Sequence, residues 1–344
     1  MNSSHNLFKT TTRRATWAAV AMLANWMMPA AHAADSYSAA RHAVMEGRAD
    51  AAAAMLQPLL ASNPRDAQAL NLMCRIHTAE EHDDAAIQEC AAAVGADPDK
   101  GEYYRWLARA YGNKAGHSGV FSAMGAVKHV RENFQQAAKL EPASADALSD
   151  LGEFYLEAPG AFGGGADKAR ALLPALTKAD AARGHWLSAR IAEVGGDDAT
   201  AESEYKQVIA TASGSAVSNG SGTSKAQGWA DLAAFYLHKN RKDDAVNAVR
   251  SVLDADPLHD GALASAAVVL YKMKQQPELA AKLFQLYLAS PHKTEEEPAF
   301  QVYTTLGNLL LRTGDKTGAQ KAFAAALALA HDYAPAQKGA GKAM

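Results

Sequence analysis

Three arginines recur in the first third of the chain at a constant interval of 34 residues. A fourth lies one helical turn before the last of them, and two asparagines lie close by. The set is Arg41, Asn71, Arg75, Arg105, Arg109 and Asn113. A guanidinium group is a rigid fork of hydrogen-bond donors that suits a carboxylate. These side chains therefore predict a binding site for acidic groups if one face carries them all. The alternative is a solvated face on which the arginines pair with acids of neighbouring helices.

No residues with a catalytic pattern accompany the arginines. The sequence lacks H-E-x-x-H, G-x-S-x-G and C-x-x-C motifs, and its 12 histidines are scattered. The densest polar run, residues 80–84, could ligate a metal, but a solvated turn with a helix cap is the simpler interpretation. The same interpretation applies to His259 with Asp260 and to the three glutamates at 295–297. We expect a protein that is not an enzyme and that has no metal site and no cofactor.

Composition excludes several further classes of protein. The chain has 344 residues, of which 49% are hydrophobic, and its formal net charge is −3. It is too hydrophobic to be mostly disordered. Its acidic balance argues against nucleic-acid binding, which needs a basic face. Two cysteines are too few for a disulfide-rich scaffold or a four-cysteine zinc site. Abundant alanine and few aromatic residues favour helices.

Prolines mark a period along the chain, and such periods reveal repeats. Pro64 and Pro98 are 34 residues apart, and so are Pro257 and Pro291. Pro142 lies in a similar local sequence. About 12 residues before several of these prolines there is an alanine, followed four residues later by a larger apolar residue or cysteine. The pattern indicates a repeated unit in which small residues let two helices approach closely.

This pattern resembles the tetratricopeptide repeat, a helix-turn-helix unit of 34 residues. The unit at 226–259 fits it at Trp229, Leu232, Ala233, Tyr236, Ala245, Val249, Val252 and Pro257. Similar units start near residues 33, 67, 101, 145, 182, 260 and 300. The resemblance implies an all-α fold, a right-handed superhelical solenoid of about eight helix hairpins whose neighbours stack into one continuous core.

In this family, certain positions of each first helix line a concave groove. The resemblance places the arginines and asparagines there, in loose similarity to the carboxylate clamps by which some of these domains hold a peptide C-terminus. The later units present apolar residues at the same positions. These are Ala230, Ala234, Leu237, Val268 and Tyr271. Such a face suits an amphipathic helix of a partner, a helix of the chain itself or a second copy of the protein.

Cys74 and Cys90 fall at positions 8 and 24 of one unit, on the facing helices of a single hairpin. In an oxidising compartment this arrangement favours a disulfide. The alternative is two buried free cysteines that act as small hydrophobic residues.

The N-terminus has the layout of a secretory signal peptide. Lys9, Arg13 and Arg14 precede an apolar run at 15–28, and Ala31-His32-Ala33 offers a small-residue cleavage site. The run is shorter than the roughly 20 residues of a membrane anchor. We therefore expect residues 1–33 to be removed on export to a periplasm of the Gram-negative type, which leaves a soluble chain without a membrane span.

The remaining chain divides at changes of composition. We expect N-terminal repeats at 34–213, a glycine- and serine-rich loop or linker at 214–225, C-terminal repeats at 226–334 and a tail at 335–344. Two insertions, at 112–130 and 158–166, interrupt hairpins of the N-terminal repeats. The pairing of these insertions resembles exported bacterial tetratricopeptide proteins, a resemblance that adds no chemistry.

These observations favour a protein–protein interaction scaffold or adaptor. Its groove would bind a peptide segment of a partner that carries acidic groups, and self-association is possible. The alternative is an accessory protein of a transport system whose arginines bind an organic acid.

Overall fold

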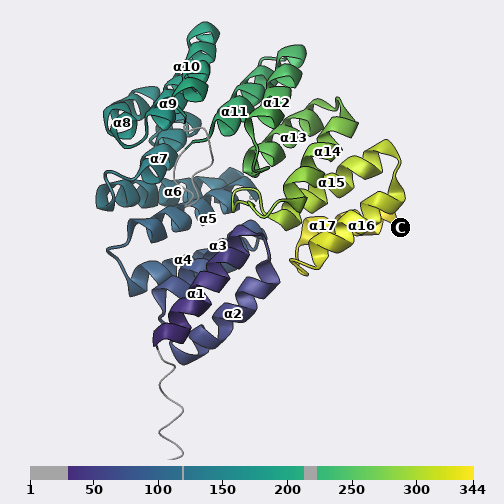
Figure 1. Cartoon of the computed structure of the whole chain (residues 1–344). Helices are drawn as coiled ribbons and strands as arrows, with labels where there is room; N and C mark the ends of the chain where they lie inside the picture. Colours follow the sequence, from purple (N-terminus) through teal and green to yellow (C-terminus); the bar gives the residue numbers. More distant parts are fainter. Residues whose placement is uncertain (1–29, 118–119, 213–222) are drawn as a thin grey trace, which may run out of the picture.

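The computed structural model describes residues 30–117, 120–212 and 223–344. These residues form 17 α-helices and one 3-10 helix, η1 (Gly160–Phe162). The helices are α1 (Ala30–Met45), α2 (Ala49–Ser62), α3 (Ala67–Ala79), α4 (Asp83–Ala96), α5 (Gly101–His117), α6 (Val120–Leu140), α7 (Ala145–Glu157), α8 (Ala166–Ala179), α9 (Ala181–Val194), α10 (Asp198–Thr211), α11 (Lys225–His238), α12 (Lys242–Ala255), α13 (Gly261–Met273), α14 (Pro277–Ala289), α15 (Ala299–Thr313), α16 (Lys316–Leu327) and α17 (Ala334–Ala343). Successive helices from α1 to α16 pair into hairpins, and the hairpins stack in chain order (Figure 1). The prediction of an all-α array of eight hairpins is confirmed.

The periodic residues have the roles that the repeat requires. The five prolines that set the period all lie in connections between hairpins, where a residue without an N–H group stops the preceding helix. Several first helices begin at a capping side chain: Asp66 accepts a hydrogen bond from Ala69 N at 3.0 Å, and Ser144 accepts one from Ala147 N at 3.3 Å. The sequence therefore encodes where each hairpin starts and ends.

Close helix packing accounts for the alanine content. Ala52, Ala86 and Ala245 are completely buried, each where the two helices of a hairpin face each other. In the second hairpin the same contact holds a disulfide between Cys74 of α3 and Cys90 of α4, with a Cα–Cα distance of 5.2 Å. The two sulfur atoms thus join the facing helices of one repeat.

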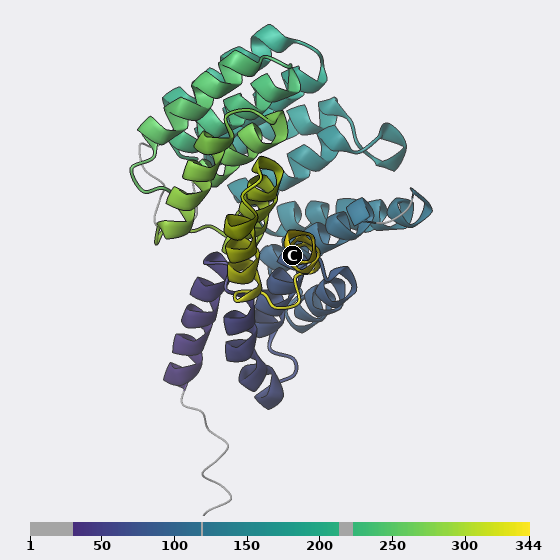
Figure 2. The same cartoon turned by 90° about the vertical axis from the view of Figure 1, so that its right-hand side faces the viewer.

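The two ends of the array meet. Side chains of α1, α2 and α3 share one hydrophobic cluster with Phe300 of α15, Ala326 of α16 and Tyr333 at the start of α17. The backbone N–H of Asp50 donates to the carbonyl of Leu329 at 3.0 Å. Figures 1 and 2 show the last helices lying beside the first ones. The superhelix therefore closes and encloses a central space.

Residues 335–344, expected to be a tail, form α17 instead. Ala336 and Ala343 of this helix are completely buried, and Gly339 lies against the ring of Phe323 in α16. The helix forms because the last hairpin has no following repeat, so its apolar face needs a cover. The prediction of a tail was wrong for this physical reason.

The second insertion packs against α6, a helix that the first insertion lengthens. The first insertion, 112–130, lengthens the end of α5 and the start of α6. Tyr111 of α5 stacks on His129 of α6 with ring centroids 4.5 Å apart. The second contains η1, whose Phe162 carbonyl accepts a hydrogen bond from Arg131 of α6 at 3.4 Å. Gly164 is required in this loop because a Cβ there would lie 1.7 Å from the carbonyl oxygen of Ala158.

Most of the expected signal peptide (1–33) and of the glycine- and serine-rich segment (214–225) lies outside the described residues. Ser224 is described, and its side chain caps α11 by accepting a hydrogen bond from Gln227 N at 3.0 Å. Across the described ranges, no helix combines the length and the hydropathy needed to cross a membrane.

Candidate functional site

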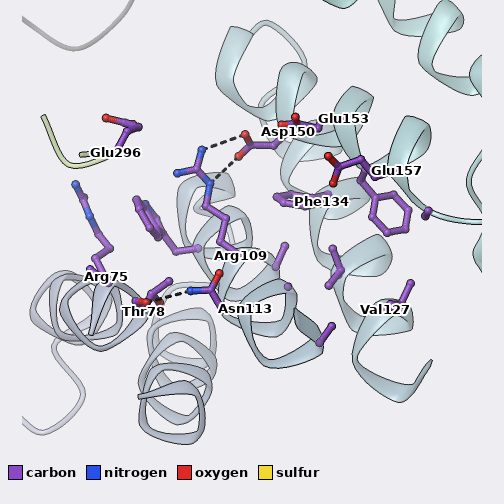
Figure 3. A pocket seen from close by; sticks show the side chains of 18 of the residues that line it. Arg75, Thr78, Arg109, Asn113, Val127, Phe134, Asp150, Glu153, Glu157 and Glu296 are labelled. Carbon is purple, nitrogen blue, oxygen red and sulfur yellow. Dashed lines mark hydrogen bonds and ion pairs between the residues drawn. The ribbon is translucent and has the colours of Figure 1, made fainter. Parts of the chain in front are cut away.

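The central space holds a cavity of about 730 Å³ between α3, α5, α6 and α7 on one side and the connection from α14 to α15 on the other (Figure 3). A second cavity of about 670 Å³ shares Asp150, Glu153 and Glu296 with the first and continues toward α9, α11 and α13. The two cavities together are the interior face of the closed array. We describe them as the concave cavity.

Arg75 enters this cavity from α3 and is already paired. Its Nε donates to Glu295 Oε1 at 2.6 Å, its Nη2 donates to the other oxygen of the same carboxylate, and its Nη1 donates to Glu102 at 3.2 Å. Burial lowers the pKa of the guanidinium, but Glu295 and Glu102 raise it by more, so Arg75 is held in its charged form. The partner Glu295 lies 220 residues away, which makes this pair a tie between the two halves of the array.

Arg105 and Arg109 of α5 share acids of the next repeat. Arg109 donates to both oxygens of Asp150, at 3.1 and 3.0 Å, and Arg105 donates to Asp150 at 3.2 Å and to Asp146 at 2.9 Å. Trp106 lies between two guanidinium groups, with Arg75 5.0 Å and Arg109 4.8 Å from its ring. These cation–π contacts and ion pairs fix the arginine side chains in place.

The remaining members of the predicted set differ from one another. Arg41 is 43% exposed and lies 3.9 Å from Glu102, a loose contact at the edge. Asn113 donates to the carbonyl of Thr78 at 3.0 Å, so it braces α5 against α3. Asn71 is 2% exposed, and its Nδ2 has no hydrogen-bond partner within the described parts of the chain. Asn71 therefore lies in the core and not on a binding face.

The prediction of a free electropositive stripe was consequently wrong. The guanidinium groups of Arg75 and Arg109, which line the larger cavity, are neutralised by acids of the same chain. This is the alternative that the sequence left open, in which the arginines pair with acids of neighbouring helices. An organic acid would meet no unpaired guanidinium there. The physical reason is that close packing of repeats brings Asp150 and Glu295 within reach, where a fixed internal partner outcompetes a mobile ligand.

Carboxylates are the most numerous charged groups in the lining of the two cavities. Acids in the lining of the two cavities outnumber guanidinium and ammonium groups by more than two to one. Glu153 of α7 and Glu296 make no hydrogen bond and no ion pair to any residue that the structure describes. In Figure 3, Glu153 lies beyond Asp150 and next to Glu157, away from the arginines. The cavity thus offers acidic groups without partners.

Burial raises the pKa of three carboxyl groups in the lining of the two cavities. Burial, assisted by the charges of Glu157 and Asp150, raises the pKa of Glu153 to about 7. Burial and the charge of Glu296 raise the pKa of Glu297 to about 7, and burial raises that of Asp231 to about 6. A carboxylate with a raised pKa becomes easier to ionise when a positive charge arrives. The carboxyl groups of Glu153, Glu297 and Asp231 therefore ionise at a higher pH than exposed carboxyl groups do.

The turn of three glutamates at 295–297 is solvated only at Glu296, whereas the sequence had suggested a solvated turn throughout. Glu295 pairs with Arg75, and Glu297 accepts a hydrogen bond from Ser265 at 2.7 Å. The expectation of a capped turn at Asp260 was correct, because this side chain accepts a hydrogen bond from Ala262 N at 2.9 Å and caps α13.

The predicted apolar groove is not an open surface. Ala230 is 2% exposed and belongs to the hydrophobic core of the C-terminal repeats. Ala234, Leu237, Val268 and Tyr271 are partly buried against the same core. The guanidinium of Arg312 covers the ring of Tyr271 at 4.5 Å. These residues lie outside the two cavities because they pack in the contact between α11 and α13.

Comparisons with known proteins agree with this architecture. Family models described as tetratricopeptide repeat match residues 43–110, 232–293 and 300–333. These parts of the chain are tetratricopeptide repeats. Repeats of this kind stack into solenoids with extended concave binding surfaces, which makes the chain a protein–protein interaction scaffold. A search of curated protein sequences finds no match.

One solved structure shows the same fold at low identity, and two others align less closely. Yeast Tom70 aligns with a TM-score of 0.50 and 15% identity over 86% of this chain and 58% of Tom70, little more than half of that protein. A thermophilic tetratricopeptide-repeat protein of Thermus thermophilus aligns with a TM-score of 0.45 and 20% identity over 52% of this chain and 90% of its own. A tetratricopeptide-repeat protein of Parabacteroides merdae aligns with a TM-score of 0.43 and 12% identity over 90% of this chain and 99% of its own.

Sequence reasoning missed Trp106, Asp150 and Glu153. A signal for Glu153 was present, because it holds the same repeat position in the fourth unit as Arg41, Arg75 and Arg109 hold in the first three. Extending that series by one unit would have shown that its charge reverses. Asp150 and Trp106 carry no comparable signal, since their roles depend on contacts between repeats.

Proposed function

We propose that the chain is a non-enzymatic scaffold that binds a segment of a partner protein in its concave cavity, and that this segment carries basic side chains. One observation carries the proposal. The guanidinium groups of the larger cavity are already ion paired, whereas Glu153 and Glu296 form no ion pair with any described residue. A partner with acidic groups would add to the surplus of negative charge.

The shape and polarity of the cavity support a side chain of the lysine or arginine type. Val127 and Phe134 of α6 and Phe154 of α7 contribute apolar lining to the same cavity as Glu153. Lysine and arginine bury an aliphatic stem against such surface while the charged end reaches a carboxylate. A volume of about 730 Å³ lies within the range of sites that hold a ligand of a few residues.

We further propose that the protein works after export, with residues 1–33 removed. The basic N-terminus and the small residues before Ala34 support this proposal, and so does the disulfide between Cys74 and Cys90, because such bonds persist in oxidising compartments. Mass spectrometry of the protein from cells is expected to give a chain that begins at Ala34. A chain that retains its first residues would contradict export with cleavage.

In-cell crosslinking followed by pull-down tests the interaction. The variant carries Glu153→Gln and Glu296→Gln, and the matched control carries Glu132→Gln and Glu278→Gln, which remove two exposed carboxylates outside the cavity lining. We expect the first variant to fold and lose its main partner while the control retains it. If both variants keep the same partners, the concave cavity is not the binding site.

A further inference from the structure

The turn between α3 and α4 brings three metal-ligating side chains together. His77 comes from the last turn of α3, Glu80 follows that helix, and His82 precedes α4. One ligand atom from each lies within 4.8 Å of those of the other two. Nδ1 of His82 is 3.7 Å from Oε2 of Glu80. None of these three side chains lines the concave cavity, although Thr78 and Ala79 beside them do, so the inference does not depend on the proposed function.

The sequence favoured a solvated turn with a helix cap at this place. The turn is solvated at Glu81 and Asp84, which are exposed, but the helix cap is absent. His82 holds the N-cap position of α4 but its side chain makes no capping hydrogen bond. Asp83 and Asp84 instead pair with His117 at 2.9 Å and with Lys114 of α5. These two aspartates are thus directed to α5, which leaves Glu80 and the histidines as a separate group.

Glu80 is a buried carboxylate whose ion-pair contact is long. It is 6% exposed, yet it accepts no hydrogen bond from any residue in the described ranges, and its nearest ion-pair contact is the 3.7 Å to His82. Burial, with the charges of Asp50 and Asp332, raises its pKa to about 7. A buried charge without a partner is costly unless it is neutralised or coordinates a cation.

His77 is oriented as metal-bound histidines usually are. Its Nδ1 lies 2.7 Å from Oε2 of Glu89, a carboxylate on the facing helix α4. A carboxylate on one ring nitrogen sets the tautomer and makes the other nitrogen a better ligand. Nε2 of His77 is therefore the ligand atom. The side chain of His82 is 37% exposed, which opens a path for an ion and leaves room for a water ligand.

We propose that His77, Glu80 and His82 form a binding site for one divalent transition metal ion of the zinc type. Two imidazoles and one carboxylate with an open fourth position are a recurring ligand set for zinc. Imidazole ligands favour zinc, copper and nickel over magnesium and calcium, which prefer oxygen. Ligand atoms around a tetrahedral zinc ion lie about 3.3 Å apart, so the observed separations close by side-chain rotation within the turn.

The ion would also brace the junction between the two ends of the array. Gln301 of α15 donates to the carbonyl of Ala79 at 2.7 Å, next to Glu80. Tyr333 at the start of α17 donates to Glu81 at 3.3 Å. Because the ligands flank these contacts on both sides, metal binding is expected to raise the melting temperature of the whole protein.

Titration of the chelator-treated, tag-free mature chain with ZnCl₂, followed by calorimetry, tests the site. We expect one equivalent of zinc to bind and the melting temperature to rise. His82→Ala and Glu80→Gln are each expected to weaken binding at least tenfold. Circular dichroism checks that both variants are folded. Glu80→Gln keeps the shape of the side chain and removes only its charge, so a folded variant that loses binding reports on the carboxylate.

His185→Ala is the matched control. Nδ1 of His185 lies 2.7 Å from Glu204, so this pair repeats the contact between His77 and Glu89 without further ligands. The control is expected to bind zinc as the unmodified protein does, whereas Glu89→Gln should bind tenfold to a hundredfold more weakly. The proposal is overturned if the unmodified protein binds no zinc, if His82→Ala binds it equally well, or if His185→Ala abolishes binding.

Discussion

Replacing Glu153 by glutamine is expected to stabilise the protein while it removes binding. The carboxylate is half-buried, has no partner among the described residues and lies near two other acids, Asp150 and Glu157. Glutamine keeps its shape but carries no charge. The substitution therefore separates the contribution of this residue to folding from its contribution to the site.

The size of the effect follows from the pKa of Glu153, which burial raises from 4.5 to about 7. A group whose pKa is raised on folding favours the folded state below its unfolded pKa, and this contribution is lost as the pH rises through the folded pKa. With 1.36 kcal/mol for each unit, the charge costs the native protein about 3 kcal/mol above pH 8 and about 1 kcal/mol at pH 5. The Glu153→Gln variant carries no charge at this position, so its stability is not lowered in this way at either pH.

Urea unfolding at pH 8 and at pH 5, followed by circular dichroism, measures the difference. We expect the Glu153→Gln variant to unfold at a higher urea concentration than the unmodified protein at pH 8, with a smaller gain at pH 5. The control Glu278→Gln removes an exposed carboxylate outside the cavity and is expected to change stability by less than about 0.5 kcal/mol. A loss of stability at pH 8, or an equal gain at both pH values, would refute the reasoning.

Three further predictions test other contacts. Arg75→Ala leaves a buried acid unpaired and is expected to lower the free energy of unfolding by about 3–5 kcal/mol, whereas Arg41→Ala removes a loose exposed contact and costs less than about 1 kcal/mol; urea unfolding of both is the check. Replacing Cys74 and Cys90 together by alanine opens a loop of 16 residues and is expected to cost about 3 kcal/mol in the chain-entropy account, and an unchanged melting temperature would contradict this. Gly47 has a φ of 67°, and a Cβ at this position would lie 2.2 Å from the backbone N of Ala299 at the start of α15. Gly47→Ala is therefore expected to separate the two ends of the array, which small-angle scattering would detect as a larger radius of gyration. An unchanged radius of gyration in a less stable protein would argue against this separation.

The fold was predictable from the sequence because its period is local. Pro64, Pro98 and the related prolines repeat with a constant spacing, and the alanines of close contact repeat with them, so helix pairs and their stacking follow without knowledge of distant contacts. The placement of Cys74 opposite Cys90 depends on the same register, since both belong to one hairpin.

The site was less predictable because its partners come from distant repeats. Arg75 meets Glu295 across 220 residues, and Glu295 belongs to a run that resembles a solvated turn. Closure of the array depends on how small rotations between repeats accumulate, which no single repeat specifies. The helix α17 was missed for a related reason: its many small residues suggest a frayed end, but they fit closely against α16.

The central claim is that the concave cavity binds basic side chains, and fluorescence anisotropy with labelled peptides measures it directly. The peptides share one apolar sequence and differ at two positions, which are lysine, glutamine or glutamate. We predict that the lysine peptide binds tightest, that its affinity rises between pH 5.5 and pH 8 as Glu153 ionises, and that the variant with Glu153→Gln and Glu296→Gln loses this preference. Tightest binding of the glutamate peptide, or equal affinity for all three, would contradict the account.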